Sequence, residues 1–274
     1  AAQLKLKVAI IDKQWLGGVC LNVGCIPSKS LLRNAEVAHI LRERGKEFGF
    51  SFSNLQFDYS IAVKRSRQVS GRLVKGVEFL MKKNGIATFI GEAKIITNDT
   101  VEVTDRDGKK SELKTKNIII ASGARSLVPS NWKVDGKMIL TYLEAILQDT
   151  LPKSVVIIGA GAIGMEFATI WNSYGVDVSI VEMLPNVLPM EDEEAAAEVS
   201  KAFTKRGIKI FTGHKVESVE SVGSKVHLLI SSDSEQKELV ADQSLIAIGF
   251  KPNSEGIGLE NVGVTTSIAG FIEI

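Results

Sequence analysis

An apolar run leads directly into three spaced glycines in the sequence Val155-Val156-Ile157-Ile158-Gly159-Ala160-Gly161-Ala162-Ile163-Gly164. The pattern G-x-G-x-x-G, directly after a buried strand and at the start of a helix, is typical of an α/β unit that binds a dinucleotide. In such a unit Gly159 allows the tight turn, Gly161 lets a pyrophosphate approach the backbone, and Gly164 allows the helix to pack closely on the strand. The phosphates are expected at the helix N-terminus, where free N–H groups and the helix dipole favour anions.

An acidic residue closes the next apolar run. Val176–Val181 predicts a second buried strand, and Glu182 follows it, 23 residues after Gly159. A carboxylate at this place accepts hydrogen bonds from the ribose hydroxyls and repels a 2′-phosphate, so the pattern favours NAD over NADP. The alternative is a glycine-rich packing turn without a nucleotide, and the combination of strand, helix and acid makes that alternative the weaker one.

The beginning of the chain has half of the same arrangement. Residues 7–11 predict a buried parallel strand that is closed by Asp12, as Glu182 closes Val176–Val181. The strand and glycine turn that precede Glu182 have no counterpart, because they would fall before residue 1. We therefore expect the chain to be the remainder of a longer protein. The alternative is a domain that begins on a short helix.

Helical and strand patterns alternate along the rest of the chain, which predicts an α/β fold with parallel sheets. Helices are expected at 28–45, with Ser28 as a possible N-cap, at 59–84 and at 191–206. A buried strand is expected at 117–121, and short strands between 87 and 115 predict a small inserted antiparallel meander. The predicted architecture is two Rossmann-like three-layer dinucleotide-binding domains, one of them incomplete.

Composition excludes several classes of protein. The 274 residues suggest two domains, and 33 Lys and Arg against 32 Asp and Glu leave a net charge of +1. This balance does not favour binding to nucleic acid or to an anionic membrane by bulk charge. The longest nearly apolar run, Val155–Met165, is too short to span a bilayer. Two cysteines are not a secreted disulfide framework.

The two cysteines, Cys20 and Cys25, are five residues apart. They could be small buried apolar residues or part of an incomplete metal site, although no metal site is expected, because only three histidines could add ligands. In a regular helix their Cα atoms would lie about 8.6 Å apart, whereas a disulfide needs about 4.4–6.8 Å. A bridge therefore requires a break in the helix, and Gly24 and Pro27 supply the freedom for one.

The stretch from Gly17 to Lys29, Gly-Gly-Val-Cys-Leu-Asn-Val-Gly-Cys-Ile-Pro-Ser-Lys, resembles the redox motif of the flavin-dependent disulfide reductases. Within that family it is most similar to the dihydrolipoamide dehydrogenases, since glutathione reductases usually carry Val-Pro-Lys after the second cysteine. The resemblance covers essentially the whole chain. Further matches are Gly91-Glu92-Ala93, Ala121-Ser122-Gly123, Ala247-Ile248-Gly249 and Pro252-Asn253. Phe250-Lys251 departs from the family, which often has two basic residues there.

The resemblance implies a role for each matching residue. Cys20 would be the interchange thiol, Cys25 the thiolate beside the flavin, and Lys29 a neighbour of the flavin that pairs with Glu166. Contacts to FAD are implied for Asp12, Gly18, Lys29, Gly91, Ser122 and Gly123, and contacts to NAD for Gly159, Gly161, Gly164, Glu182, Val216 and Gly249.

The implied domains are a truncated FAD-binding domain at 1–149 that carries the redox disulfide, an NAD-binding domain at 150–268, and the start of a return to the FAD domain at 269–274. The implied reaction is oxidation of protein-bound dihydrolipoamide through Cys20–Cys25 and FAD, with NAD⁺ as the acceptor. The first FAD glycine motif and the C-terminal interface domain would lie outside the chain. The chain is therefore expected to be catalytically incomplete and to bind FAD weakly or not at all.

The implied partner is a lipoyl domain of a 2-oxo-acid dehydrogenase complex or a glycine-cleavage carrier, with a homodimer as the state of the full-length protein. The expected location is the cytoplasm, with the mitochondrial matrix or a plastid as alternatives. Two other functions stay open at this point. One is another disulfide reductase or a mercuric reductase of the same family, and the other is a non-catalytic NAD-binding or assembly module.

Overall fold

The computed structural model describes all 274 residues, which form two compact units built from several segments each. The first unit contains residues 1–25, 69–125 and 250–274, and the second contains residues 26–68 and 126–249. The domain boundaries expected after residues 149 and 268 follow the cofactor motifs of the sequence and stay a prediction.

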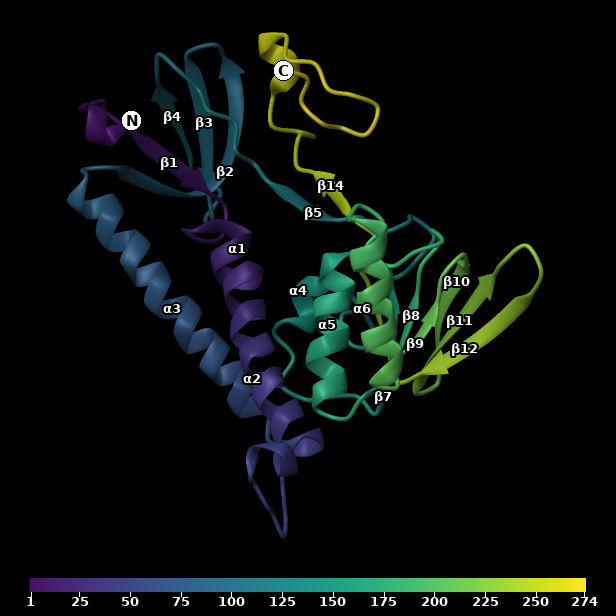
Figure 1. The fold of residues 1–274 in the computed structure, drawn as a ribbon. Coiled ribbons are helices and arrows are strands. Elements are labelled where there is room, and N and C mark those ends of the chain that lie inside the picture. The colour runs from purple at the N-terminus through teal and green to yellow at the C-terminus, as the bar shows by residue number, and fades with distance from the viewer. The chain divides into compact units, whose positions relative to one another are not determined.

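A five-stranded parallel sheet forms the centre of the second unit, in the order β6-β13-β7-β8-β9. The central strand β7 and its neighbour β8 consist largely of Val and Ile. Four of the five residues of β7 and three of the five of β8 are buried, as expected of strands covered on both faces. Helices α5 and α6 lie on one face of this sheet (Figure 1). The bounds are β6 Ile139–Leu140, β7 Ser154–Ile158, α5 Ala162–Ser173, β8 Asp177–Val181, α6 Glu193–Lys205, β9 Lys209–Phe211 and β13 Gln243–Ile246.

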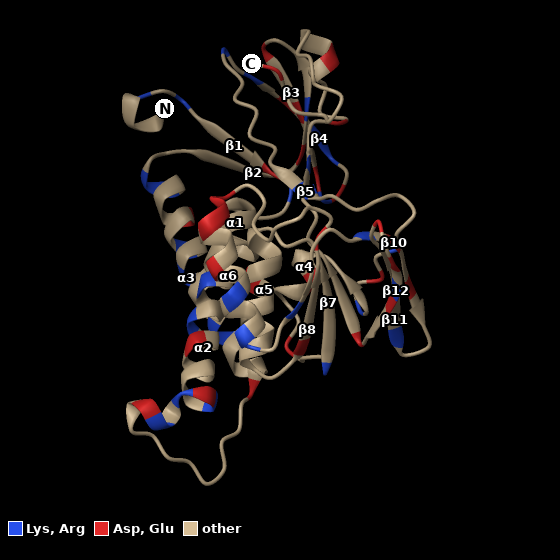
Figure 2. Ribbon diagram, turned by 45° about the vertical axis from the view of Figure 1, so that its right-hand side comes forward, with Lys and Arg blue, Asp and Glu red and all other residues tan.

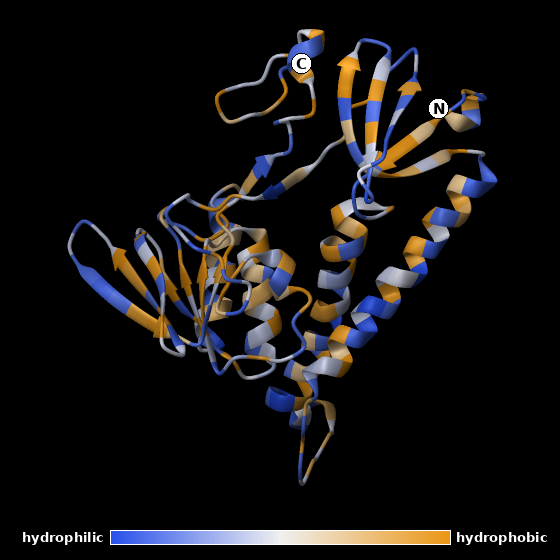
Figure 3. Ribbon diagram, turned by 180° about the vertical axis from the view of Figure 1, so that it is seen from behind, coloured by the Kyte–Doolittle hydropathy of each residue, from blue (hydrophilic) through white to orange (hydrophobic).

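A three-stranded antiparallel sheet covers the other face. We call this sheet, β10 to β12, the meander. It consists of β10 (Lys215–Val222), β11 (Lys225–Ser231) and β12 (Gln236–Ala241). Every second residue of β11 is buried against the parallel sheet, while β12 is hydrophilic at its beginning and apolar at its end (Figure 3). Helices, parallel sheet and meander make three layers, which confirms the predicted α/β class.

The remaining helices of this unit come from two parts of the chain. They are most of α2 (Cys25–Glu43), the 3₁₀ helix η2 (Gly45–Phe48), the beginning of α3 (Tyr59–Lys83) and the short α4 (Tyr142–Ala145). The expectation that Ser28 caps α2 is wrong, because the helix already begins at Cys25. Pro27 is tolerated inside the first turn, where its missing N–H has no helical acceptor.

The first unit has a four-stranded mixed sheet in the order β1-β2-β3-β4. Strand β1 (Ala9–Asp12) is parallel to β2 (Ala87–Thr97), whereas β3 (Thr100–Asp105) and β4 (Lys110–Lys114) continue the sheet antiparallel. This arrangement confirms the small antiparallel insertion that was expected between residues 87 and 115. The unit also contains η1 (Ala2–Leu4), α1 (Gly18–Val23), the last part of α3 and η3 (Leu259–Val262).

The strand expected at 117–121 is not formed, and this prediction was wrong. Residues 117–121 pair with no strand, and the side chain of Ile119 is 87% exposed. The apolar run has the composition of a buried strand, but no neighbouring strand offers it a hydrogen-bonding ladder. Pairing begins only at β5 (Ala124–Ser126), whose partner is β14 (Phe250–Pro252).

Charged side chains of both signs are interspersed along α2 and α6 (Figure 2). In α6 the order follows the helix dipole, with the cap Asp192 and Glu193 at its beginning and Lys205 in its last turn. None of the helices has the length and apolar character needed to cross a membrane.

Candidate functional site

The three glycines of the turn after β7 have three different environments. Gly159 has a φ of +104°, and a Cβ there would collide with the Ala247 carbonyl. A Cβ on Gly164 would collide with the Gly159 carbonyl, so this glycine is required by packing inside the protein. Gly161 is the N-cap of α5 and has no neighbour within 4 Å of a built Cβ. The backbone at Gly161 is therefore open to an approaching group, as an anion site needs.

Glu182 is fixed at the end of β8 and faces this turn. Its Oε2 accepts from the Ala160 N–H at 2.8 Å, and its Oε1 accepts from the Leu184 N–H at 2.9 Å. A carboxylate oxygen has two lone pairs, so each oxygen keeps one for a further donor such as a ribose hydroxyl. The residue thus holds the glycine turn and offers acceptors beside it.

Two further predicted NAD contacts lie in the same unit. Gly249, with a φ of +131°, follows β13, and the N–H of Ala247, two residues before it, donates to the Ile158 carbonyl that precedes the turn. Val216 is the second residue of β10 and packs against the core below the meander. The glycine turn, Glu182 and Gly249 all follow carboxyl ends of parallel strands, which is where open α/β sheets bind ligands.

Cys20 and Cys25 form a disulfide, which confirms the predicted bridge. Their Cα atoms are 4.6 Å apart, far less than in a continuous helix, because α1 ends at Val23 and α2 begins at Cys25. Gly24 between them has φ −128° and ψ −118°, outside the helical region. Both cysteines are exposed, so the bridge is accessible to a thiol.

Asn22 is a residue of this motif that the sequence alone did not single out. Its Nδ2 donates to the carbonyls of Leu16 and Gly18 at 3.0 and 2.9 Å. The bond to Leu16 ties α1 back to the loop that leads into it, and the bond to Gly18 lies within α1. The only signal in the sequence is the position of Asn22 between the two cysteines.

Lys29 and Glu166 are brought together within the second unit. The Nζ of Lys29 on α2 lies 2.7 Å from Oε1 of Glu166 on α5, and the side chains are 63% and 28% exposed. An ion pair so open to water contributes little stability, about 0–1 kcal/mol. At the other end of α2, Arg42 donates to the carbonyls of Asn172 and Ser173 at the end of α5. Helix α2 therefore contacts α5 at two places, through Lys29 near its beginning and through Arg42 near its end.

Among the predicted FAD contacts, Asp12 ends β1 and accepts from the N–H groups of Gln14 and Trp15 through Oδ1, at 2.7 and 2.8 Å. Gly18 has a φ of +64° and open space around a built Cβ. Gly91 is explained by the sheet itself, because a Cβ there would collide with the Thr104 carbonyl. Its identity thus carries no information about a ligand.

Ser122 and Gly123 lie in the extended segment before β5. Asn253 holds both of them, since its Nδ2 donates to the Ser122 carbonyl at 3.0 Å and its N–H donates to the Gly123 carbonyl at 2.9 Å. Arg125 in turn donates to Asn253 Oδ1 at 2.9 Å. The sequence pointed to Asn253 only as part of a Pro-Asn match, and these contacts give it a bracing role.

Comparisons with known proteins agree with these features. The sequence model of the family "Pyridine nucleotide-disulphide oxidoreductase" matches residues 1–274. The dihydrolipoyl dehydrogenase of Mycobacterium leprae is 48% identical over 278 residues, which cover 100% of this chain and 59% of the relative. That of Corynebacterium glutamicum is 44% identical over 277 residues, with coverages of 100% and 58%.

Two solved structures are similar in fold. LpdA from Mycobacterium tuberculosis superposes with a TM-score of 0.88 at 26% identity, covering 96% of this chain and 57% of that one. The HOCl-induced flavoprotein disulfide reductase RclA from Escherichia coli, in a Cu(II) complex, superposes with a TM-score of 0.85 at 25% identity, covering 100% and 58%. The chain thus spans somewhat less than three fifths of the length of the relatives it matches.

Proposed function

The chain belongs to the pyridine nucleotide-disulphide oxidoreductase family, and we propose that it carries the redox disulfide and nucleotide-binding parts of a flavin-dependent dehydrogenase of dihydrolipoamide. The observation that carries this proposal is the exposed Cys20–Cys25 bridge at the beginning of α2, the helix on which Lys29 meets Glu166. The relatives that bear the name dihydrolipoyl dehydrogenase, at 44–48% identity, support the choice of substrate.

The cysteines act by thiol–disulfide exchange. A substrate thiolate attacks the Sγ of Cys20, the Cys20–Cys25 bond breaks, and its electron pair remains on Cys25 as a thiolate. The second thiolate of the substrate then attacks the substrate sulfur that is bound to Cys20. The substrate leaves as a closed disulfide, and the electron pair of the broken bond remains on Cys20 as a thiolate. Each turnover reduces one protein disulfide by two electrons and oxidises one dithiol.

The residues present fit the two cofactors of the proposed reaction. Glu182 keeps free lone pairs beside an open helix N-terminus, which suits the ribose and pyrophosphate of NAD. Asp12 uses only Oδ1 for the backbone, so Oδ2 is open to a ribose hydroxyl of FAD. When bound, FAD supplies the transfer of two electrons from a thiolate to the nicotinamide as a hydride equivalent. Lys29, held by Glu166, supplies a positive charge one helical turn from Cys25.

The proposal extends to the partners of the whole protein. A lipoyl domain of a 2-oxo-acid dehydrogenase complex or a glycine-cleavage carrier would deliver the dithiol, and the protein would act as a homodimer. Cytoplasmic location is part of the same proposal, and the bacterial origin of the named relatives supports it.

The direct test is reduction of the chain by dihydrolipoamide, followed by counting of thiols with a mass label. We expect two labelled cysteines per chain, Cys20 and Cys25, and a much slower reaction with glutathione at equal thiol concentration. In parallel, titration with NADH tests the nucleotide part. Equal rates with both thiols, together with no binding of NADH, would contradict the proposal and favour a different reductase or a non-catalytic module.

A further inference from the structure

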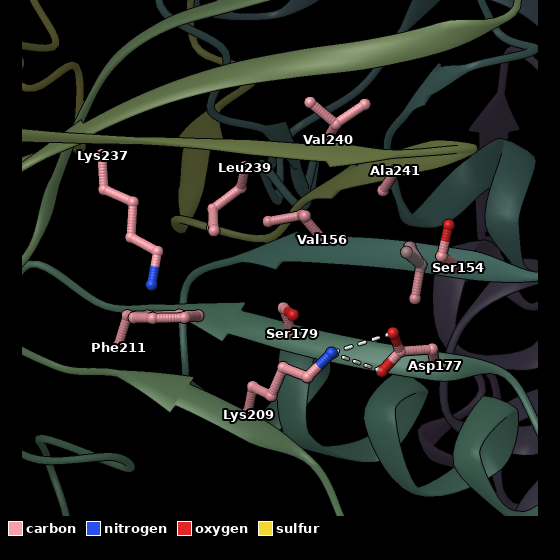
Figure 4. A pocket seen from close by; sticks show the side chains of 11 residues that line it. Ser154, Val156, Asp177, Ser179, Lys209, Phe211, Lys237, Leu239, Val240 and Ala241 are labelled. Carbon is pink, nitrogen blue, oxygen red and sulfur yellow. Dashed lines mark hydrogen bonds and ion pairs between the residues drawn. The ribbon is translucent and has the colours of Figure 1, made fainter.

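An open cavity of about 260 Å³ lies in the second unit between the parallel sheet and β12 (Figure 4). The strand register explains where it forms. Ile158, Val181 and Phe211 are in register across β7, β8 and β9 and belong to the core under the meander. The next row on the same face, Val156, Ser179 and Lys209, has a small polar residue at its centre. The cavity lies over this row, and the small side chain of Ser179 is part of its lining.

The wall of this cavity is mainly apolar. Val156, Leu239, Ala241 and the ring of Phe211 line it, and Val156 and Ala241 are only 2% exposed. Such a lining, interrupted by a few polar groups, is typical of small-molecule sites. The volume lies just below the usual range for drug-sized ligands, about 300–1,000 Å³, so a small ligand fits and a dinucleotide does not.

The charged groups at the opening have an excess of positive charge. Lys209 pairs with Asp177 at 2.9 Å. Lys237 makes no ion pair, and its Nζ lies 4.7 Å from the centroid of the Phe211 ring. The Ser179 hydroxyl makes no hydrogen bond within the protein, although it lines the same space. One unpaired ammonium and one free hydroxyl are therefore available as donors to a ligand in this cavity.

We propose that this cavity binds a small monocarboxylate with a branched or aromatic apolar group. The apolar group fills the space between Val156, Leu239 and Phe211, and the carboxylate meets the positive charge of Lys237. A monoanion matches the single uncompensated charge, whereas a phosphate dianion would keep a charge without a partner and would leave the apolar wall uncovered. The cavity reaches Ser154 and Asp177, the first residues of β7 and β8, so this site is distinct from the glycine turn and Glu182, which follow the ends of these strands.

The test is a titration of the chain with sodium 4-methylpentanoate, followed by the NMR methyl signals of Val156 and Leu239. We expect both signals to shift and a Kd on the order of 1 mM, as befits so small a ligand. Two probes serve as controls: 4-methylpentanamide has the same apolar group without the charge, and inorganic phosphate has charge without the apolar group.

Two variants test the assignment from opposite sides. Lys237→Gln is expected to weaken binding about tenfold, the loss of one hydrogen bond to a charged group. Ser179→Val narrows the cavity with a residue that suits a strand and is expected to weaken binding. Lys215→Gln is the matched control, since Lys215 is an exposed lysine of the same meander that does not line the cavity.

The proposal is overturned by the absence of a shift at about 20 mM carboxylate, well above the expected Kd. It is overturned equally by amide or phosphate binding as tightly as the carboxylate. Wild-type affinity of the Lys237→Gln variant also overturns it, and this outcome is informative even where Ser179→Val fails to fold.

Discussion

Replacing Glu182 by Gln tests the nucleotide part of the account. The carboxylate accepts one backbone N–H on each oxygen, from Ala160 and from Leu184. Glutamine keeps the shape and one acceptor oxygen, but its amide nitrogen can only donate. One of the two backbone N–H groups therefore loses its partner, and one ribose hydroxyl loses an acceptor.

The size of the effect follows from these bonds. A hydrogen bond to a charged group contributes about 1.5–3 kcal/mol, so NADH affinity is expected to fall about 10- to 100-fold. The loss of negative charge also removes repulsion against a 2′-phosphate, and the preference for NADH over NADPH is expected to shrink at least about tenfold further. The unpaired N–H lowers the free energy of unfolding by about 1–2 kcal/mol.

The assay is calorimetric titration of wild-type and variant chains with NADH and with NADPH. Glu191→Gln is the matched control, because Glu191 is an exposed acid of the following loop and its side chain makes no bond to the turn. A Glu182→Gln variant that keeps the wild-type ratio of the two affinities would contradict a role of the Glu182 carboxylate in the choice between NADH and NADPH, whatever its stability.

Three further outcomes are expected. Gly164→Ala gains helix propensity of up to about 1 kcal/mol, yet its Cβ meets the Gly159 carbonyl and approaches Ile157. Urea unfolding is therefore expected to show a free energy of unfolding that is lower by about 1–2 kcal/mol. A stabilised variant would contradict the close packing at Gly164. Asn22→Ala removes two hydrogen bonds to backbone carbonyls. Dithiothreitol is therefore expected to reduce the Cys20–Cys25 bridge several-fold faster, and an unchanged rate would contradict this. Burial and Arg206 lower the pKa of His39 below its usual 6.5, so the unfolded chain takes up this proton first. The contribution of His39 to stability is constant above about pH 6.5 and falls as the pH drops below it, and His39→Gln should reduce the pH dependence of urea unfolding in that range.

The sequence was informative where one short segment determines its own conformation. The glycine turn at 159–164 and the interruption at Gly24 were predictable, because a positive φ, a close approach or a helix break needs particular residues at particular spacings. The resemblance to a family then supplied pairings over a long sequence distance, such as Lys29 with Glu166, which no local pattern contains.

Features that depend on neighbours distant in sequence were missed or wrong. The run at 117–121 has strand composition, but a strand also needs a partner, and the pattern does not say whether one is there. The bracing contacts of Asn22 and Asn253 arise from loop geometry. The cavity beside Ser179 depends on the register of three strands and on the path of β12 above them.

Trapping of a mixed disulfide with oxidised lipoamide tests the roles of Cys20 and Cys25 directly. In the proposed exchange the substrate thiolate attacks Cys20, so the Cys25→Ser chain, whose Cys20 has no partner, should gain one lipoamide adduct on the peptide that contains Cys20. The Cys20→Ser chain should form the adduct at Cys25 far more slowly. Equal trapping at both cysteines, or faster trapping at Cys25, would contradict the assigned roles.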